Sequence, residues 1–305
     1  MRHPIVFSIL LLASCAIAHA GTPIDQSRPL DVHGSVSVSN VSGEVTVTGW
    51  DRPQVRITGT LGEGAKPLKI EGDENSLSIK VEAKKSSGGW FSLGNESHMK
   101  PTTLNILVPI GAAINLDLVS SNARVENLTG GKIGIDSVSG RVHVKADSPE
   151  ISIDAVSGDV TIAGKTDRLD VDTVSGDVHA PMIGKRGKLE SVSGDITVAG
   201  GPFEQMNAST VSGDLDIRGG ITASGKMDIE TMSGDVSLLL PKSASARIDA
   251  STFSGDIESA LGQASHQQHG SGSELSTRIG TGGGNISLES FSGDIRIRLS
   301  AEAGN

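Results

Sequence analysis

The chain has 305 residues with 39 glycines, one cysteine, no tyrosine, 2% aromatic residues and a formal net charge of −10. With so few aromatic rings, a core must be built from Val, Ile, Leu and Ala in a thin layer. The acidic balance argues against a nucleic-acid partner, because binding to phosphates needs clustered Lys and Arg. Abundant Gly, Ser and β-branched residues predict many short strands joined by turns.

Residues 1–20 are typical of a secretory signal peptide, with an apolar run that ends at the small-x-small cleavage motif Ala18-His19-Ala20. We therefore expect an exported protein, periplasmic or extracellular, with a linker at 21–30. A second interpretation stays open. The motif Leu12-Ala13-Ser14-Cys15 fits the pattern at which bacterial lipoproteins are cleaved, and it would make the chain a lipoprotein anchored through Cys15. No later stretch reaches the ~18 apolar residues of a membrane span, so we expect no transmembrane helix in the mature chain.

A unit of apolar, Ser, Gly, acidic and apolar residues recurs along the chain. From Ser139 the serines are spaced by 18, 18, 18, 19, 21, 21 and 38 residues, and such a period is the signature of a solenoid. Because 38 is twice 19, we predict a hidden repeat at 271–275. A degenerate repeat lies at 119–122 and an isolated one at 41–45. The predicted repeat turns comprise Ser139, Gly140, Ser157, Gly158, Asp159, Ser175, Gly176, Asp177, Ser193, Gly194, Asp195, Ser212, Gly213, Asp214, Ser233, Gly234, Asp235, Ser254, Gly255, Asp256, Ser292, Gly293 and Asp294.

Each repeat predicts a strand, a corner and a second strand. Apolar residues alternate with polar ones over 151–162, at odd positions before Ser157-Gly158-Asp159 and at even positions after it. Alternation is the pattern of a strand with one buried face. The change of phase requires a corner at the triplet, where Gly accepts a positive φ. We therefore predict an all-β parallel β-solenoid, β-helix-like, with rungs of about 19 residues.

The strands outside the regular array have irregular spacing. We expect them to form an N-terminal β cap, which would cover the open edge of the first rung. The predicted organisation is a cap at 31–118 with a loop insert at 84–101, a repeat array at 119–299 with a mobile loop at about 260–272, and a tail at 300–305.

The Ser-Gly-Asp repeats resemble a bacterial family of β-strand repeat proteins that are usually labelled putative adhesins, a domain of unknown function. Further likenesses are Gly49-Trp50-Asp51, Ile106-Leu107-Val108-Pro109 and the closing run 282–288, and the resemblance covers roughly 31–299. It implies a cell-envelope β-solenoid without an established catalytic site, associated in some relatives with envelope-stress signalling. The insert after residue 84 and the long stretch after residue 260 depart from the pattern.

Stacked turns would place the repeat aspartates in one column at ~4.8 Å spacing. Such a column is a candidate weak Ca²⁺ surface. The repeat lacks the Gly-Gly-x-Gly-x-Asp pattern of solenoids that bind Ca²⁺ between turns. We therefore expect the carboxylates to accept hydrogen bonds from turn amides and Ser hydroxyls, and we predict no metal and no cofactor.

Motifs of catalysis are weak, because neither His-Glu-x-x-His nor Gly-x-Ser-x-Gly occurs. We expect His266 and His269 to be a solvated pair, and Ser97-His98-Met99-Lys100 to match Ser-x-x-Lys only by letter. The segments 164–166 and 220–226 resemble parts of a P-loop, but we expect both to be loops between strands. No catalytic residue is predicted.

Two adjacent rings, Trp90 and Phe91, lie in the polar insert and are a candidate partner contact; the alternative is that they pack back onto the cap. The repetition itself favours a non-enzymatic envelope protein, an adhesin or binding scaffold. Its expected partner is an unidentified envelope component, polysaccharide or protein. The alternatives are a carbohydrate-active β-helix enzyme, since parallel β-helices also carry polysaccharide lyases and hydrolases, and an envelope-stress sensor component.

Overall fold

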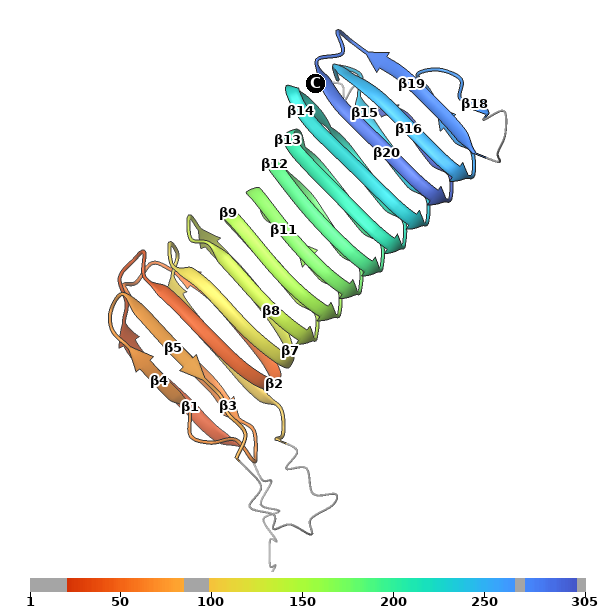
Figure 1. The fold of residues 1–305 in the computed structure, drawn as a ribbon. Coiled ribbons are helices and arrows are strands. Elements are labelled where there is room, and N and C mark those ends of the chain that lie inside the picture. Colours follow the sequence, from red (N-terminus) through yellow and green to blue (C-terminus); the bar gives the residue numbers. More distant parts are fainter. Residues whose placement is uncertain (1–20, 85–98, 267–271, 301–305) are drawn as a thin grey trace, which may run out of the picture.

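The computed structural model describes residues 21–84, 99–266 and 272–300, and every regular element in these ranges is a β-strand. The signal segment, Trp90, Phe91, His98 and His269 lie outside the described residues. Figure 1 shows a long rod of stacked strands. The strands are β1 (Thr22–Pro29), β2 (Ser35–Trp50), β3 (Gln54–Leu61), β4 (Lys69–Gly72), β5 (Ser76–Lys80), β6 (Thr102–Pro109), β7 (Ala113–Thr129), β8 (Ile133–Ser139), β9 (Val142–Ser157), β10 (Val160–Ile162), β11 (Thr166–Ser175), β12 (Val178–Ser193), β13 (Ile196–Ser212), β14 (Leu215–Ser233), β15 (Val236–Pro241), β16 (Ala246–Ser254), β17 (Ile257–Ser259), β18 (Ser265–His266), β19 (Ser273–Ile279), β20 (Gly284–Ser292) and β21 (Ile295–Ser300).

The central part of the rod is a parallel stack in which each rung pairs in register with the next. The turn serine of one rung lies opposite that of its neighbour, as between β9 and β11, β11 and β12, and β12 and β13. The predicted parallel β-solenoid is confirmed. The stack also begins earlier than expected, because Ser42 pairs with Ser120, and Ser120 with Ser139. The isolated first repeat is therefore a rung of the same stack and not part of a separate cap.

The core is a thin aliphatic layer between the strands of each rung. Ile151, Ile153, Val160 and Ile162 are each at most 1% exposed, and equivalent positions in the other rungs are also buried. The one aromatic ring among the largest fully buried side chains is that of Phe203. Burial of these aliphatic groups drives folding, while the small width of the layer leaves little room for rings.

The Ser-Gly-Asp corners are joined by hydrogen bonds between rungs. The amide of Gly194 donates to the Ser212 carbonyl at 3.1 Å, and the amide of Ile196 donates to the Asp214 carbonyl at 2.9 Å. In the opposite direction, the amide of Asp214 donates to Oδ1 of Asp195 at 2.8 Å. Gly194 has a φ of +142°, which favours glycine.

Antiparallel strands close the N-terminal end. β1 pairs with β3 and β3 pairs with β6, while β4 pairs with β5. Strands β5 and β6 then continue in parallel onto β2. The predicted linker at 21–30 is wrong, because eight of its residues form β1 and pair along their whole length with β3.

The C-terminal rung is inserted out of sequence order. Ser292 of β20 pairs with Ser233 of β14 on one side and with Ser254 of β16 on the other. The predicted hidden repeat at 271–275 is wrong. Residues 273–275 belong to β19, which runs antiparallel to β16 instead of adding a parallel rung. The expected loop at 260–272 includes the short strand β18. Of the two segments expected to be loops between strands, 220–226 lies inside β14 and is not a loop, whereas Gly164 and Lys165 do connect two strands.

Substituting Gly194 by Val tests the stacked corner. A Cβ at Gly194 would collide with the carbonyl oxygen of Gly176 in the neighbouring rung, and the positive φ adds strain. We expect a loss of roughly 2–3 kcal/mol of unfolding free energy, read as a lower midpoint in a thermal melt. The control is Gly130→Val, where φ is +90° but a Cβ meets no atom within 4 Å. Equal midpoints for the two variants would contradict the stacked corner.

Candidate functional site

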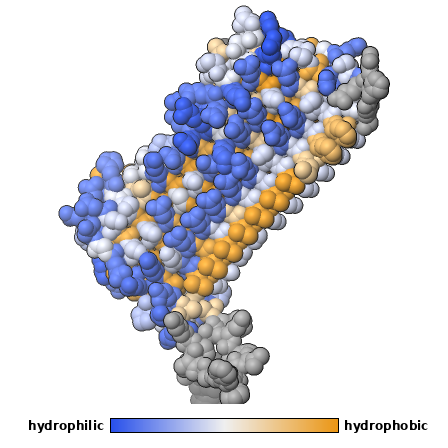
Figure 2. Space-filling model, viewed as in Figure 1, coloured by the Kyte–Doolittle hydropathy of each residue, from blue (hydrophilic) through white to orange (hydrophobic). Residues whose placement is uncertain are grey.

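A continuous line of exposed apolar side chains runs along one edge of the rod. Each is the residue immediately before a turn serine, and the serines pair in register, so the side chains lie one above another. Figure 2 shows this line as an orange stripe that becomes paler toward the C-terminal end. Their exposed fractions range from 46% to 60%. We call this set the apolar ladder; in spatial order it is Val119, Val138, Val156, Val174, Val192, Val211, Met232, Phe291 and Phe253.

Toward its C-terminal end the ladder changes from valine to methionine and then phenylalanine. There the rings of Phe291 and Phe253 stack at 4.8 Å between centroids with an angle of 5° between planes. This contact joins residues 38 positions apart in sequence and depends on the insertion of β20 between β14 and β16. The out-of-order rung therefore keeps the ladder continuous.

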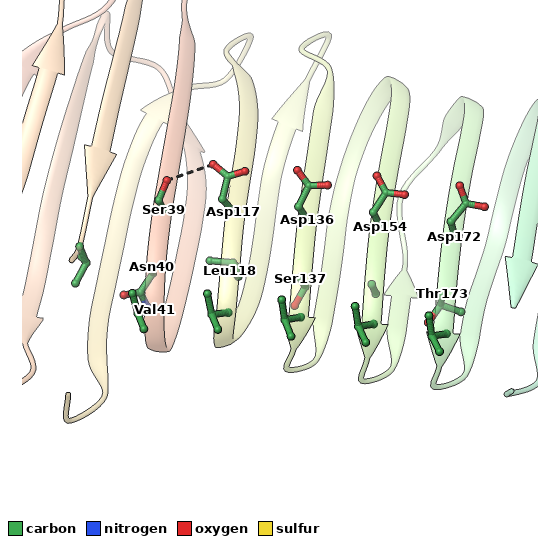
Figure 3. A pocket seen from close by; sticks show the side chains of 16 residues that line it. Ser39, Asn40, Val41, Asp117, Leu118, Asp136, Ser137, Asp154, Asp172 and Thr173 are labelled. Carbon is green, nitrogen blue, oxygen red and sulfur yellow. Dashed lines mark hydrogen bonds between the residues drawn. The ribbon is translucent and has the colours of Figure 1, made fainter. Parts of the chain in front are cut away.

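A row of carboxylates follows the ladder on the strand side, two residues before it in seven of its nine rungs; Ser209 and Ser251 take this position in the other two. Asp117, Asp136, Asp154 and Asp172 are paired in register through β7, β8, β9 and β11. Figure 3 shows these four side chains side by side and pointing the same way. The row continues through Glu190 in the next rung, is interrupted by Ser209, and resumes. We call it the strand acidic row: Asp117, Asp136, Asp154, Asp172, Glu190, Glu230 and Glu289.

A groove of about 640 Å³ lies between the strand acidic row and the N-terminal half of the ladder. Inward-facing residues between the two lines, among them Leu118, Ser137 and Thr173, form its floor. A second groove of about 510 Å³ follows the ladder around Met232, Phe253 and Phe291 and is bordered by glutamates. An elongated ligand therefore has a hollow along most of the ladder.

The close spacing of the carboxylates affects their ionisation. The pKa of Asp136 is raised above 3.8, first because partial burial disfavours the charged form and then because the charges of Asp154 and Asp117 lie on either side. At the N-terminal end of the row, the Ser39 hydroxyl donates a hydrogen bond to Oδ2 of Asp117 at 3.2 Å and so stabilises that carboxylate. The strand acidic row is thus a line of like charges that lacks full compensation.

A second line of carboxylates lies past the corner, three residues after the ladder in seven of its nine rungs. It consists of the repeat aspartates, and most of them accept a hydrogen bond through Oδ1 from the aspartate amide of an adjacent rung. The pKa of Asp235 is lowered, first by the hydrogen bond from the Asp294 amide and then by the hydrogen bond from Arg296. The Ser hydroxyls were expected to donate to these carboxylates, but those of Ser139 and Ser157 donate to backbone carbonyls instead. We call this line the corner acidic row: Asp159, Asp177, Asp195, Asp214, Asp235, Asp294 and Asp256.

Basic side chains lie farther from the ladder on the same face. Arg168 and Arg186 pair in register four residues before the strand acidic row. Lys188 is closer and contacts Asp172 at 3.0 Å and Glu190 at 3.2 Å. Partial burial opposes the charge of Lys188, but its hydrogen bonds to Asp172 and Glu190 outweigh this and raise its pKa. The side of the face nearest the ladder therefore remains acidic.

The His, Cys, Asp and Glu side chains of the described residues do not gather into a metal site. No group of three or more His, Cys, Asp or Glu in the described ranges has the arrangement of a metal site. His266 lies beside the Ser273 hydroxyl, with its Nδ1 at 3.1 Å, and its predicted partner His269 lies outside the described residues. The arrangement can bind by apolar contact and charge, over a long surface.

Sequence reasoning identified the corner residues but missed the ladder and the strand acidic row. The signal was present in the alternation: Val156 has the same parity as Asp154, whereas the buried residues Ile151, Ile153 and Ala155 have the other. An apolar residue in the outward phase, repeated in every rung, indicates an exposed line.

The fold is that of an all-β repeat protein with a long exposed apolar line along one face. The model of the Toastrack DUF4097 family matches residues 33–298, so the chain belongs to that family. No curated protein matches the sequence.

The solved structures that the chain matches share little sequence with it. A "putative adhesin" from Bacteroides fragilis is 11% identical with a TM-score of 0.42, covering 90% of this chain and 97% of its own. A "putative lipid binding protein" from Parabacteroides distasonis is 12% identical with a TM-score of 0.43, covering 92% and 98%. A "putative cell adhesion protein" from Clostridium sporogenes is 14% identical with a TM-score of 0.23, covering 92% and 100%. Across the described ranges, no helix is long and apolar enough to cross a membrane.

Substituting Asp136 by Asn tests the repulsion within the strand acidic row. A raised pKa in the folded state means that the ionised carboxylate destabilises the fold above that pKa, and that this effect disappears as pH falls below the ordinary value of 3.8. We expect Asp136→Asn to raise the thermal midpoint at pH 7, with a gain that shrinks toward pH 3.5. The control, Asp51→Asn, makes the same change of charge outside the row. A lower midpoint for Asp136→Asn at pH 7 would contradict the interpretation.

Proposed function

We propose that this protein is an exported, non-enzymatic scaffold of the bacterial cell envelope, an adhesin-like protein that binds an extended envelope component along the apolar ladder. The observation that carries the proposal is the ladder itself. Single exposed apolar residues are normal on a protein surface, but a contiguous line of them marks an interaction site. Export is supported by the signal-like pattern of residues 1–20.

A rigid surface favours binding of an elongated partner. The hydrogen bonds at each corner hold neighbouring rungs in one register, so the ladder is preorganised and little conformational freedom is lost on binding. The non-enzymatic role is supported by the repetition, because catalysis needs a few distinct groups that converge in one pocket. Along this face the same groups recur from rung to rung.

Binding to native cell envelope tests the proposal. The immobilised chain is incubated with solubilised envelope, and retained protein, polysaccharide and lipid are each quantified against a variant with Val156→Thr, Val174→Thr and Val192→Thr. Threonine keeps the β-branched shape while adding a hydroxyl. We expect the variant to lose most of the retained component, since three adjacent rungs of the ladder lose their apolar character.

The matched control replaces exposed apolar residues outside the ladder, with Val32→Thr, Ile110→Thr and Met182→Thr. It should retain the component as the unmodified chain does. Equal loss in both variants, or no loss in the ladder variant, would overturn the proposed binding site.

A further inference from the structure

We propose that the apolar ladder receives a basic amphipathic helix of a partner polypeptide. The inference rests on the proposed binding role and adds the chemistry of the partner. Three features of the face lead to it: the charge on the two sides of the ladder, the straight single line of apolar side chains, and the grooves beside them.

Charge complementarity gives the sign of the partner. The strand acidic row lies two residues before the ladder, and the corner acidic row lies three residues after it. A corner aspartate such as Asp195 accepts the next amide through Oδ1, and it is exposed. From Val156 onward, a ligand lying on the ladder has the strand acidic row on one side and, past the turn Ser and Gly, the corner acidic row on the other. Lys or Arg on both sides of its own apolar contact would satisfy them.

The shape of the ladder favours a helix over a strand. Nine side chains at ~4.8 Å per rung form a line of roughly 40 Å. An amphipathic helix presents one apolar stripe with charged positions along both of its sides. A strand instead places its polar side chains on the face opposite its apolar ones, away from the two acidic rows. The grooves beside the ladder provide room for the apolar side chains of such a helix.

The same charges disfavour two other occupants. A second copy packed ladder to ladder would bring acidic rows close to acidic rows at the centre of the contact. A membrane with anionic headgroups would be repelled by both rows. The basic residues Arg168 and Arg186 lie farther from the ladder than the strand acidic row. Lys188 and Arg296 each contact two carboxylates of the rows, which leaves the other members of both rows without these cations.

A designed peptide pair tests the proposal on the full chain. The probe is a labelled 18-residue helix-forming peptide with a stripe of Leu flanked on both sides by Lys, and its binding is followed by fluorescence anisotropy. We expect it to bind at least tenfold more tightly than the same peptide with Glu in place of Lys. It should also bind at least tenfold more tightly than a peptide with the Lys and Leu residues reordered to abolish the stripe. Added salt should weaken binding, because charges near the surface are screened.

Variants of the chain separate a specific site from general attraction to an acidic protein. Asp154→Asn with Asp172→Asn should weaken binding of the Lys peptide at least fivefold, and the three Val→Thr substitutions in the ladder should do the same. The matched control is Asp167→Asn with Glu204→Gln, which removes the same charge from residues that pair with Lys185 and Arg186 away from the ladder. This control should bind as the unmodified chain does, and thermal melts establish that every variant is folded.

Several results would overturn the proposal. Equal binding of the striped and reordered Lys peptides, or equal weakening by the control variant, would mean attraction to net charge alone. Ladder-dependent binding of neutral phosphatidylcholine vesicles without binding of the Lys peptide would assign the ladder to lipid. A ladder-dependent dimer in sedimentation would assign it to a second copy. If the peptide fails while ladder-dependent retention of envelope material persists, the proposed function stands and this inference is wrong.

Discussion

The hydrogen bonds between successive Ser-Gly-Asp corners are the constraint on which the rest of the structure depends. The Gly194 amide binds the Ser212 carbonyl, the Ile196 amide binds the Asp214 carbonyl, and the Asp195 carboxylate accepts the Asp214 amide. Only a residue without a Cβ fits at the glycine, because the neighbouring rung lies against it. The corners therefore set both the register and the closeness of the rungs, while aliphatic burial supplies the driving force for folding.

A fixed register converts a repeated sequence into rows of like side chains. Inward positions become a continuous aliphatic layer, and outward positions become the apolar ladder and its two acidic rows. This has an electrostatic cost, seen in the raised pKa of Asp136 between Asp154 and Asp117. A fold that retains unneutralised charge and exposed apolar groups along one line is more consistent with a binding surface than with a surface selected only for stability.

Much of the fold could be predicted from the sequence, because the alternation of apolar residues changes phase at each corner. The out-of-order rung could not, since its 38-residue spacing looks like two ordinary periods and pairing between β14 and β20 has no local signal. Strand β1 was missed for a different reason: it is an exposed edge with Ile24 as its one buried side chain, so it shows no alternation. The ladder was missed because Val156 reads as core until its parity is compared with that of Ala155.

The order of rungs along the ladder can be measured directly by engineered disulfides, because residues 21–305 contain no cysteine. Adjacent rungs place equivalent Cα atoms ~4.8 Å apart, within the usual disulfide range of about 4.4–6.8 Å, whereas positions two rungs apart are too distant. Met232→Cys with Phe291→Cys should therefore cross-link on mild oxidation, although 59 residues separate them in sequence. Met232→Cys with Phe253→Cys, only 21 residues apart, should remain reduced. Intact-mass measurement and peptide mapping distinguish the outcomes. Cross-linking of the second pair without the first would contradict the continuous ladder and the stacking that produces it.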